Sequence, residues 1–537
     1  MSFNPNYYDY PFPSRRQVQF ARRGMVCTTQ PLAAQAGLSM LQRGGNAIDA
    51  AVATAIAMTV LEPTSNGIGS DAFALIWTGE GLQGLNASGP APAKFDLDYV
   101  RKTCGDKMPD HGWIPVTVPG APAAWAELSR KYGKLKFADL FEPAIHYARY
   151  GYPLAVTTAR SWQRAYTSYK AIFKEDYFQP WFETFSPQGR VPRAGESVTL
   201  LGHAKTLEAL AASNCESFYR GEIADQIDQF FQKIGGWLSG EDLASFHPEW
   251  VEPISTDYHG YTVSEIPPNG HGIIALMALN ILDGFHLNNQ TAPETYHKQI
   301  EAMKLAFSDG QAFVADPSAM DVSTEALLSP DYARERRALI GEEALLPQAG
   351  RPDCGGTIYL CTADGEGNMV SYIQSNYKGF GSGLVVPGTG ISLQDRGANF
   401  YLDPASANCA APHKKPYHTI IPGFLSQDGR PLGPFGVMGG FMQPQGHVQV
   451  VMNLIDFQLN PQQALDAPRW QWVGEKKVQV EQSFAPASLD ALIRRGHQVE
   501  IVADNSVMGR GQIILRGEDG VLAGGSEARA DGSIALF

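Results

Sequence analysis

The sequence has few cysteines and lacks the short motifs that mark several common enzyme classes. Its 537 residues include six cysteines, and no two of them form a C-x-x-C pair. Cysteines this few and this scattered exclude a disulfide framework and give no sign of a structural zinc site. The chain also has no G-x-S-x-G, G-x-x-x-x-G-K-[ST] or H-E-x-x-H motif. Its twelve histidines are spread singly, so we expect neither a metal ion nor an organic cofactor.

Long apolar runs and excess positive charge are absent too. The best candidate membrane segment, residues 47–61, contains Asp49 and is shorter than the roughly 20 residues that a span needs. The first residues show no apolar signal-peptide region, so we expect a cytoplasmic protein. Asp and Glu number 55 against 42 Lys and Arg, a net charge of −13. This balance argues against nucleic acid or an anionic membrane as a partner.

What is present is the composition of an ordinary globular protein. The sequence is 44% hydrophobic and 10% aromatic, and its length alone suggests about three domains. Asn46 is expected to cap a buried, alanine-rich helix. The local patterns predict further helices over 122–132, 137–150, 205–213, 294–309, 446–457 and 486–496, and strands over 357–363, 369–374, 390–394, 419–425 and 511–515. We expect an α/β protein, mainly helical at first and β-rich later, with an extended arm at 5–16.

A threonine at the junction of these two halves is the first candidate catalytic residue. Thr357 follows Gly356 at the start of a predicted strand. As an isolated residue it is an ordinary strand former. If the 356–357 bond were cut, however, the threonine would carry a hydroxyl beside a free α-amine. That amine, with a pKa of about 8, can accept the hydroxyl proton near neutral pH.

A pair of glycines further along the chain is the second candidate. Gly439 and Gly440 precede a predicted helix in the segment GPFGVMGGFMQPQGH. The simplest interpretation of the pair is a tight turn. The alternative is an oxyanion hole built from backbone N–H groups, which requires close approach of the chain to the substrate.

These two elements, about 80 residues apart, resemble the γ-glutamyltransferase family of N-terminal-nucleophile (Ntn) hydrolases. Matching blocks extend over nearly the whole chain and include GMVCTTQPLAAQAGLSMLQRGGNAIDAAV, VTVPGAPAAWAEL, IPPNGHG and VMGGFMQPQGHVQVVMNL. The resemblance implies a four-layer αββα Ntn-hydrolase sandwich made as one domain. It also implies autocatalytic cleavage into a large, mainly helical subunit, residues 1–356, and a small subunit, residues 357–537, with possible assembly into a dimer of heterodimers.

The resemblance also assigns the catalytic residues. Thr357 corresponds to the nucleophile and to the new amino terminus of the small subunit. Gly439 and Gly440 correspond to the oxyanion-hole glycines. Ser375 lies where the family has a hydroxyl residue that orients the nucleophile.

The substrate-binding positions depart from those of γ-glutamyl enzymes. Where the family holds an α-ammonium group with an amide, a glutamine and an aspartate, this chain has Tyr377, Arg396 and Asn399. These changes invert the local charge preference and favour a carboxylate, which the planar guanidinium group binds well. A structural ion pair is the alternative role for Arg396.

Two further positions bear on the substrate. The arginine that holds the glutamyl carboxylate in the family is replaced at its nearest aligned position by Leu97, whereas His418 and Thr419 occupy the place of a Ser-Ser pair that contacts substrate carboxylate. The pattern is similar to the signal-free branch that includes oxamate amidohydrolases of purine catabolism. We therefore expect hydrolysis of a small anionic amide, with oxamate, giving oxalate and ammonia, as the specific substrate. A γ-glutamyl (glutathione) hydrolase or transferase and a catalytically silent binding relative remain the alternatives.

Overall fold

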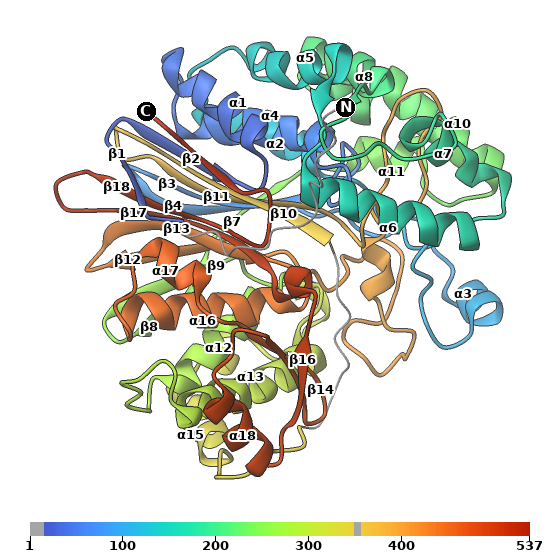
Figure 1. Cartoon of the computed structure of the whole chain (residues 1–537). Coiled ribbons are helices and arrows are strands. Elements are labelled where there is room, and N and C mark those ends of the chain that lie inside the picture. Colours follow the sequence, from blue (N-terminus) through green and yellow to red (C-terminus); the bar gives the residue numbers. More distant parts are fainter. Residues whose placement is uncertain (1–15, 348–355) are drawn as a thin grey trace, which may run out of the picture.

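Two β-sheets of seven strands each form the middle of the molecule, and helices cover both outer faces (Figure 1). The computed structural model describes residues 16–347 and 356–537. The first sheet has the order β19 (Ser533–Leu536), β2 (Gly24–Thr28), β10 (Gly356–Asp364), β11 (Met369–Tyr377), β3 (Asp71–Thr78), β4 (Gly81–Ala87) and β7 (Glu249–Val251). The second has the order β1 (Gln19–Ala21), β18 (Leu522–Ser526), β17 (Arg510–Arg516), β13 (Arg430–Met438), β12 (Gly423–Gln427), β9 (Tyr261–Glu265) and β8 (Ile254–Tyr258). Neighbouring strands within both sheets are antiparallel.

The sheets pack against each other through one shared apolar layer. Its buried side chains come from both sheets and include Met25, Phe73, Leu75, Tyr359, Ile373, Phe424, Met438, Ile514 and Leu522. Because both faces of a central strand are covered, such a strand is apolar throughout instead of alternating. In β11 every residue is buried, including its polar residues Ser371, Gln374, Ser375 and Asn376.

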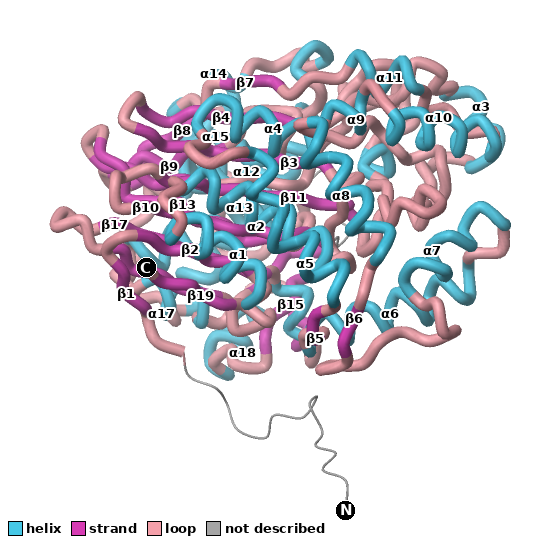
Figure 2. The backbone as a smooth tube through the Cα atoms, turned by 90° about the horizontal axis from the view of Figure 1, so that it is seen from above, coloured by secondary structure: helices cyan, strands magenta, loops and turns pink. Residues whose placement is uncertain are grey.

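Helices complete the two outer layers. Over the first sheet lie α1 (Pro31–Gln42), α2 (Ala47–Leu61), α4 (Ala121–Tyr132), α5 (Glu142–Tyr150) and α8 (Leu201–Ser213), as Figure 2 shows from above. Over the second sheet lie α12 (Gly272–Leu282), α13 (Pro293–Phe313) and α16 (Met442–Ile455). These layers agree with the expected mixed α/β architecture.

The remaining elements lie around this four-layer body. The helices are α3 (Leu97–Cys104), α6 (Val156–Ile172), α7 (Gln179–Phe185), α9 (Glu216–Tyr219), α10 (Glu222–Ile234), α11 (Gly240–Ser245), α14 (Thr324–Leu327), α15 (Pro330–Ala338), α17 (Pro461–Asp466) and α18 (Pro486–Arg494). A three-stranded sheet contains β14 (Trp470–Gly474), β15 (Lys477–Glu481) and β16 (Gln498–Val502), and a two-stranded one contains β5 (Tyr152–Pro153) and β6 (Ser197–Val198).

Helix α2 shows how the sequence specifies a buried element. Asn46 accepts hydrogen bonds from the N–H groups of Ile48 and Asp49, and the Asp49 side chain accepts one from the Asn46 N–H, forming a capping box. All 15 residues of the helix are buried. Alanine on every side allows the neighbouring helices and the first sheet to approach closely. The expected cap and buried helix are both confirmed.

Several element boundaries differ from those expected. Residues 390–394, expected to form a strand, make only two isolated bridges. Ser392 pairs with Val385, and Leu393 pairs with Gly69. The strand expected over 419–425 begins at Gly423. The hairpin of β8 and β9, inside a stretch expected to be mainly helical, was not anticipated. The arm expected at 5–16 lies, up to residue 15, outside the described residues.

Strands from before and after residue 357 alternate within both sheets. In the first sheet, β10 and β11 lie between β2 and β3. In the second sheet, β12, β13, β17 and β18 lie between β1 and β9. The two halves of the chain therefore share both sheets. Within residues 16–347 and 356–537, no helix combines the length and apolar character required to cross a membrane.

Candidate active site

The candidate nucleophile lies buried at a break in the regular pairing of β10 and β11. Gly356 pairs with Tyr377 and Ile358 pairs with Gln374, so a β-bulge in β11 places Ser375 and Asn376 opposite the single residue Thr357. Bulges re-aim a side chain and are common beside active sites. The Thr357 Oγ1 atom is 3.1 Å from Ser375 Oγ, which also accepts the N–H of Tyr377 at 2.8 Å. The structure thus brings together the two hydroxyl residues that the resemblance pairs.

The end of β11 holds the aromatic ring of Tyr377 against an arginine. Tyr377 has φ of 76°, a left-handed conformation that is unusual for a bulky residue and that concentrates at functional sites. The Arg396 guanidinium carbon is 4.6 Å from the centre of the Tyr377 ring, which is within range of a cation–π contact. Arg396 is fully buried and begins the short helix η4 (Arg396–Asn399).

The hydrogen bonds of Arg396 are incomplete. Its Nη1 donates to Thr419 Oγ1 at 2.7 Å, and its Nε is 3.4 Å from Asp71 Oδ2. Among the described residues, Nε and Nη2 have no hydrogen-bond partner. Buried donors are normally satisfied, so these nitrogens can bind a group supplied from outside. The ion pair with Asp71 exists, but it uses only part of the guanidinium group.

Asp71 is a residue of this site that the sequence interpretation missed. It begins β3, directly opposite Ser375 in the ladder. Its Oδ2 accepts from His418 Nε2 at 3.0 Å, while His418 Nδ1 accepts a weaker bond from the backbone N–H of Ile420. Burial raises the pKa of Asp71 to about 7, and Arg396 opposes this only in part. Burial also lowers the pKa of His418 well below its usual value, so the imidazole is neutral. The only feature of the sequence that could have indicated Asp71 is its position as an acidic residue at the start of an otherwise apolar strand.

The glycine pair joins this region from the second sheet. Gly439 and Gly440 follow β13 with φ of 140° and 59°, values that favour glycine. Helix α16 starts directly afterwards at Met442, earlier than expected. In α16, Gln443 accepts the N–H of Ile421 at 3.0 Å. The glycine turn is therefore tied to the segment that contains His418 and Thr419.

The candidate Asn399 and the departure from the family at Leu97 lie in different surroundings. Asn399 is buried at the end of η4, and its Nδ2 has no hydrogen-bond partner among the described residues. Leu97 packs against an apolar cluster that includes Phe95, Phe400 and Leu402. An apolar residue, Leu97, therefore lies where the resemblance places a carboxylate-binding arginine.

Several buried polar atoms without a hydrogen-bond partner belong to these residues and their neighbours. Within the described part of the chain, the buried atoms without a hydrogen-bond partner include Asp71 Oδ1, His271 Nε2, Asp395 Oδ2, Arg396 Nε and Nη2, Asn399 Nδ2 and Gln443 Nε2. Native interiors contain few such atoms. Their clustering indicates a place prepared for a small polar molecule or for water.

A second buried ion pair adjoins the glycine turn. Arg510 is opposite Met438 in the ladder and lies 3.6 Å from Glu62, which accepts a 2.6 Å hydrogen bond from Thr29. Burial raises the pKa of Glu62, and Arg510 opposes the shift. The sequence interpretation missed this pair, because Glu62 and Arg510 come from opposite ends of the chain.

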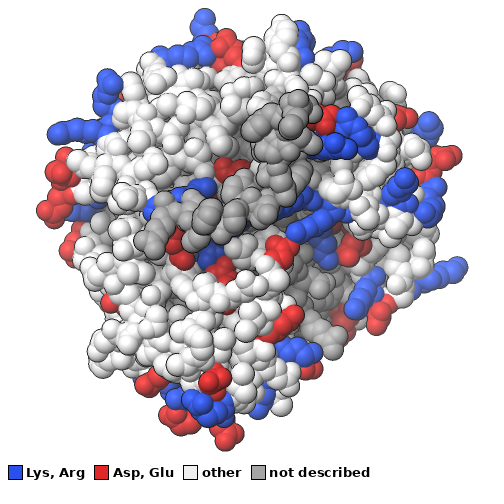
Figure 3. Space-filling model, in the orientation of Figure 1, with Lys and Arg blue, Asp and Glu red and all other residues white. Residues whose placement is uncertain are grey.

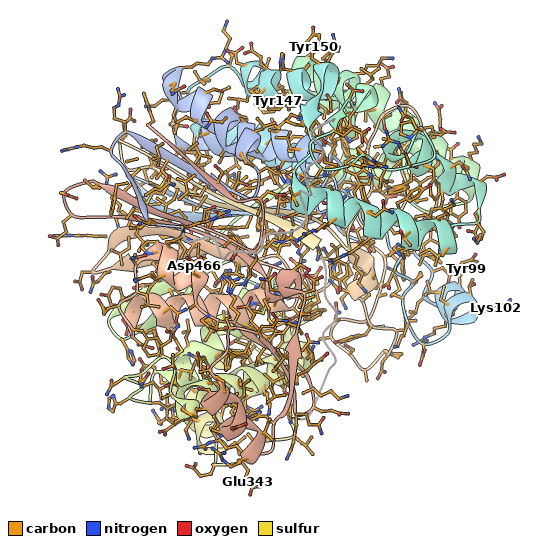
Figure 4. All side chains as sticks on the ribbon, viewed as in Figure 1. Tyr99, Lys102, Tyr147, Tyr150, Glu343 and Asp466 are labelled. Atoms are coloured by element: carbon orange, nitrogen blue, oxygen red, sulfur yellow. The ribbon has the colours of Figure 1, made fainter. Side chains whose placement is uncertain are left out.

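One face of the molecule and one surface cavity can be compared with this buried cluster. On the face in Figure 3, basic and acidic side chains of the described residues are interspersed. A cavity of about 490 Å³ lined by residues that include Glu127, Tyr219 and Arg220 lies on the helical side. In Figure 4, the labelled Tyr150 and Lys102 lie at the periphery, away from the space between the sheets. The catalytic candidates lie in the buried cluster and do not line this cavity.

A protein-family comparison decides the affiliation. The model of the Gamma-glutamyltranspeptidase family matches residues 33–537. The chain belongs to this family. The match covers the threonine, the glycine pair and the charged cluster alike, so the resemblance inferred from the sequence is confirmed.

The chain aligns with individual relatives over nearly their full lengths. The chain is 34% identical to the Glutathione hydrolase-like YwrD proenzyme of Bacillus subtilis, covering 95% of this chain and 97% of the relative. It is 34% identical to the Oxamate amidohydrolase proenzyme of Klebsiella pneumoniae, covering 96% and 98%. The crystal structure of a cephalosporin acylase from Bacillus halodurans is 60% identical, with a TM-score of 0.97 and coverage of 100% and 99%.

Family membership establishes the reaction class. The chain is a hydrolase of the gamma-glutamyltranspeptidase family, and two of its relatives, the YwrD and oxamate amidohydrolase proteins, are proenzymes. The fold matches the Ntn-hydrolase architecture of these relatives.

Proposed function

We propose that the chain cleaves itself between residues 356 and 357 and then hydrolyses the amide of a small carboxylate. The mature enzyme would consist of residues 1–356 and 357–537. The position of Thr357 supports this proposal, because its buried hydroxyl faces the β-bulge of β11 and lies 3.1 Å from Ser375 Oγ. In self-cleavage the Thr357 hydroxyl attacks the carbonyl carbon of Gly356, the peptide C–N bond breaks, and water hydrolyses the resulting ester.

Substrate hydrolysis repeats this chemistry with the free amino terminus. The Thr357 α-amine accepts the hydroxyl proton, and Oγ attacks the amide carbonyl. The N–H groups of Gly439 and Gly440 stabilise the oxyanion, an effect of about 3 kcal/mol for one such donor. The protonated amine gives its proton to the leaving nitrogen, ammonia departs, and water hydrolyses the threonyl ester to release the carboxylate product.

The single observation that carries the substrate class is the incomplete bonding of Arg396. Its Nε and Nη2 are buried without a hydrogen-bond partner among the described residues, and so is Asn399 Nδ2. A substrate carboxylate can accept from these donors with the forked geometry that arginine favours. Below about pH 7, Asp71 is protonated, which leaves the positive charge of Arg396 available to the substrate.

Oxamate is our specific candidate, because it combines one carboxylate with one primary amide. The 34% identity to an oxamate amidohydrolase supports it. The 60% identity to a cephalosporin acylase supports a second candidate, a larger acyl amide. A γ-glutamyl compound is less favoured, since Leu97 packs in an apolar cluster. Roles in the cytoplasm and in purine catabolism, and assembly as a dimer of heterodimers, stay predictions.

The test begins with denaturing electrophoresis of the purified wild type, Thr357→Ala and Thr357→Ser. We expect two bands for the wild type, slower processing for the serine variant and one band for the alanine variant. The processed enzyme is then assayed in parallel for ammonia from oxamate, glutamate from glutathione and cleavage of a cephalosporin amide. Release of glutamate alone would overturn the substrate proposal. A persistent single band for both the wild type and Thr357→Ala would identify a silent binding relative.

A further inference from the structure

Three buried side chains with metal-binding atoms meet outside the candidate active site. His297 and Glu301 are on α13, and His497 precedes β16. The ligand atoms of the three residues all lie within 4.8 Å of one another. His297 Nδ1 is 2.9 Å from His497 Nε2, which is 3.7 Å from Glu301 Oε1. Because His297 and Glu301 are four residues apart on one helix, they point the same way.

The outer contacts of this cluster orient the three side chains. The His297 Nε2 atom lies 3.1 Å from the carbonyl oxygen of Gly341, so Nε2–H donates there and the Nδ1 lone pair faces His497. Glu301 accepts from Lys304 Nζ at 2.7 Å and from the N–H of Leu345 at 3.0 Å. A backbone carbonyl behind a histidine and hydrogen bonds behind a carboxylate are the usual supports of metal ligands.

The two imidazoles are buried side by side. Burial lowers the pKa of His297 to about 4 and that of His497 to about 3, and nearby cations, including Lys304 and Arg495, act in the same direction. His497 Nδ1 has no hydrogen-bond partner among the described residues.

We propose that His297 Nδ1, His497 Nε2 and a Glu301 carboxylate oxygen bind one divalent transition-metal ion, with zinc as the preferred ion. Two imidazoles and one carboxylate are a zinc donor set, whereas calcium and magnesium require mainly oxygen. Tetrahedral zinc holds two nitrogen ligands roughly 3.3 Å apart. The 2.9 Å contact thus needs to open only slightly, and the ion replaces the proton that the two nitrogens otherwise share in a hydrogen bond.

The role of such an ion would be structural. It joins α13, from the part of the chain before residue 357, to the turn before β16, from the part after it. The same ligands hold Gly341 and Leu345, and Arg495 bonds Glu342. These contacts hold residues 341–345, close to the end of the described segment 16–347, in place. The site depends on the folded chain and not on the proposed cleavage, so the two proposals can fail separately.

The test measures metal in the folded, full-length protein. Wild type is stripped with a chelator, dialysed against micromolar zinc and analysed by elemental mass spectrometry, alongside His297→Gln, Glu301→Gln and His497→Gln. We expect one equivalent of zinc in the wild type, a zinc-dependent rise of several degrees in Tm, and loss of both in the histidine variants. His259→Gln is the matched control, because this histidine also contacts carboxylates, Asp456 and Asp283.

A second measurement needs no variant. Cobalt(II) added to the stripped wild type should give the visible absorption bands of a tetrahedral ion with nitrogen ligands, and zinc should displace it. If the wild type binds neither ion and its Tm does not respond, the contact is a hydrogen bond between two neutral histidines and the proposal is wrong. Stoichiometric binding that survives in both histidine variants would also overturn it.

Discussion

Two buried arginine clusters in this fold differ in how fully their hydrogen bonds are satisfied. In the first, Arg469 donates to Glu527 at 2.8 Å, and Arg529 joins Glu527 to Glu481 at 2.8 and 2.6 Å. No side-chain nitrogen or oxygen of these four is unpartnered within the described chain. In the second, Arg396 and its neighbour Asp71 leave three such atoms unpartnered.

The two clusters also shift carboxyl pKa values in opposite directions. Burial alone would raise the pKa of Glu527, but Arg469 and Arg529 outweigh it and lower the pKa to about 2. Burial raises the pKa of Asp71 to about 7, because Arg396 compensates incompletely. A satisfied cluster fixes the fold, whereas an unsatisfied one keeps the capacity to bind a ligand. This difference favours substrate binding over a purely structural role for Arg396.

The largest expected effect comes from removing the arginine of each cluster. Arg469→Met leaves Glu527 buried with one partner fewer, and we expect the free energy of unfolding to fall by about 3–5 kcal/mol. Arg396→Met should lower it by less than half as much, because Asp71 can take up a proton. Urea unfolding near neutral pH measures both. Equal destabilisation by the two variants would mean that Arg396 is a structural residue.

Stability should depend on pH in opposite ways at the two clusters. The folded pKa of Asp71 lies above its unfolded value of about 3.9, so its contribution falls as pH rises from about 4 to 7, by about 1 kcal/mol per pH unit. Glu527 has a depressed folded pKa, so its contribution is present above about pH 4 and is lost as pH falls towards 2.

Urea unfolding across this range tests the prediction with Asp71→Asn and Glu527→Gln. The asparagine variant should lose the slope between about pH 4 and 7. Asp98→Asn, at an exposed aspartate on α3, is the control and should behave like the wild type. An unchanged slope in Asp71→Asn would show that this carboxyl is ionised in the folded protein throughout the range.

The smallest expected effect is a change in KM when the aromatic ring of Tyr377, which contacts Arg396, is removed. Tyr377→Leu removes a cation–π contact worth about 0.5–2 kcal/mol, so KM for an anionic amide should rise several-fold while kcat changes less. Tyr377→Phe retains the ring and should stay close to the wild type. A fall in kcat alone, with KM unchanged, would assign Tyr377 to the chemistry at Thr357 instead of to the arginine.

The sequence predicted local elements better than the contacts between them. The capped helix at 47–61 and the hairpin after Gly356 were found because capping and apolar runs are local signals. The bridges of Ser392 and Leu393 were mistaken for a strand, because apolar residues in a buried loop have the same composition. Asp71 and the His297–His497 contact could not be found, since only long-range pairing brings these residues together.

The alternation of strands along both sheets has a consequence for the cut chain. Because β10 and β11 hydrogen-bond to β2 and β3 on either side, pulling residues 357–537 away would break ladders in both sheets and expose the apolar layer between them. The two pieces would thus dissociate only by unfolding together. Cleavage would free an amino terminus in the middle of a rigid body, and neither fragment should be recoverable as a folded protein by itself.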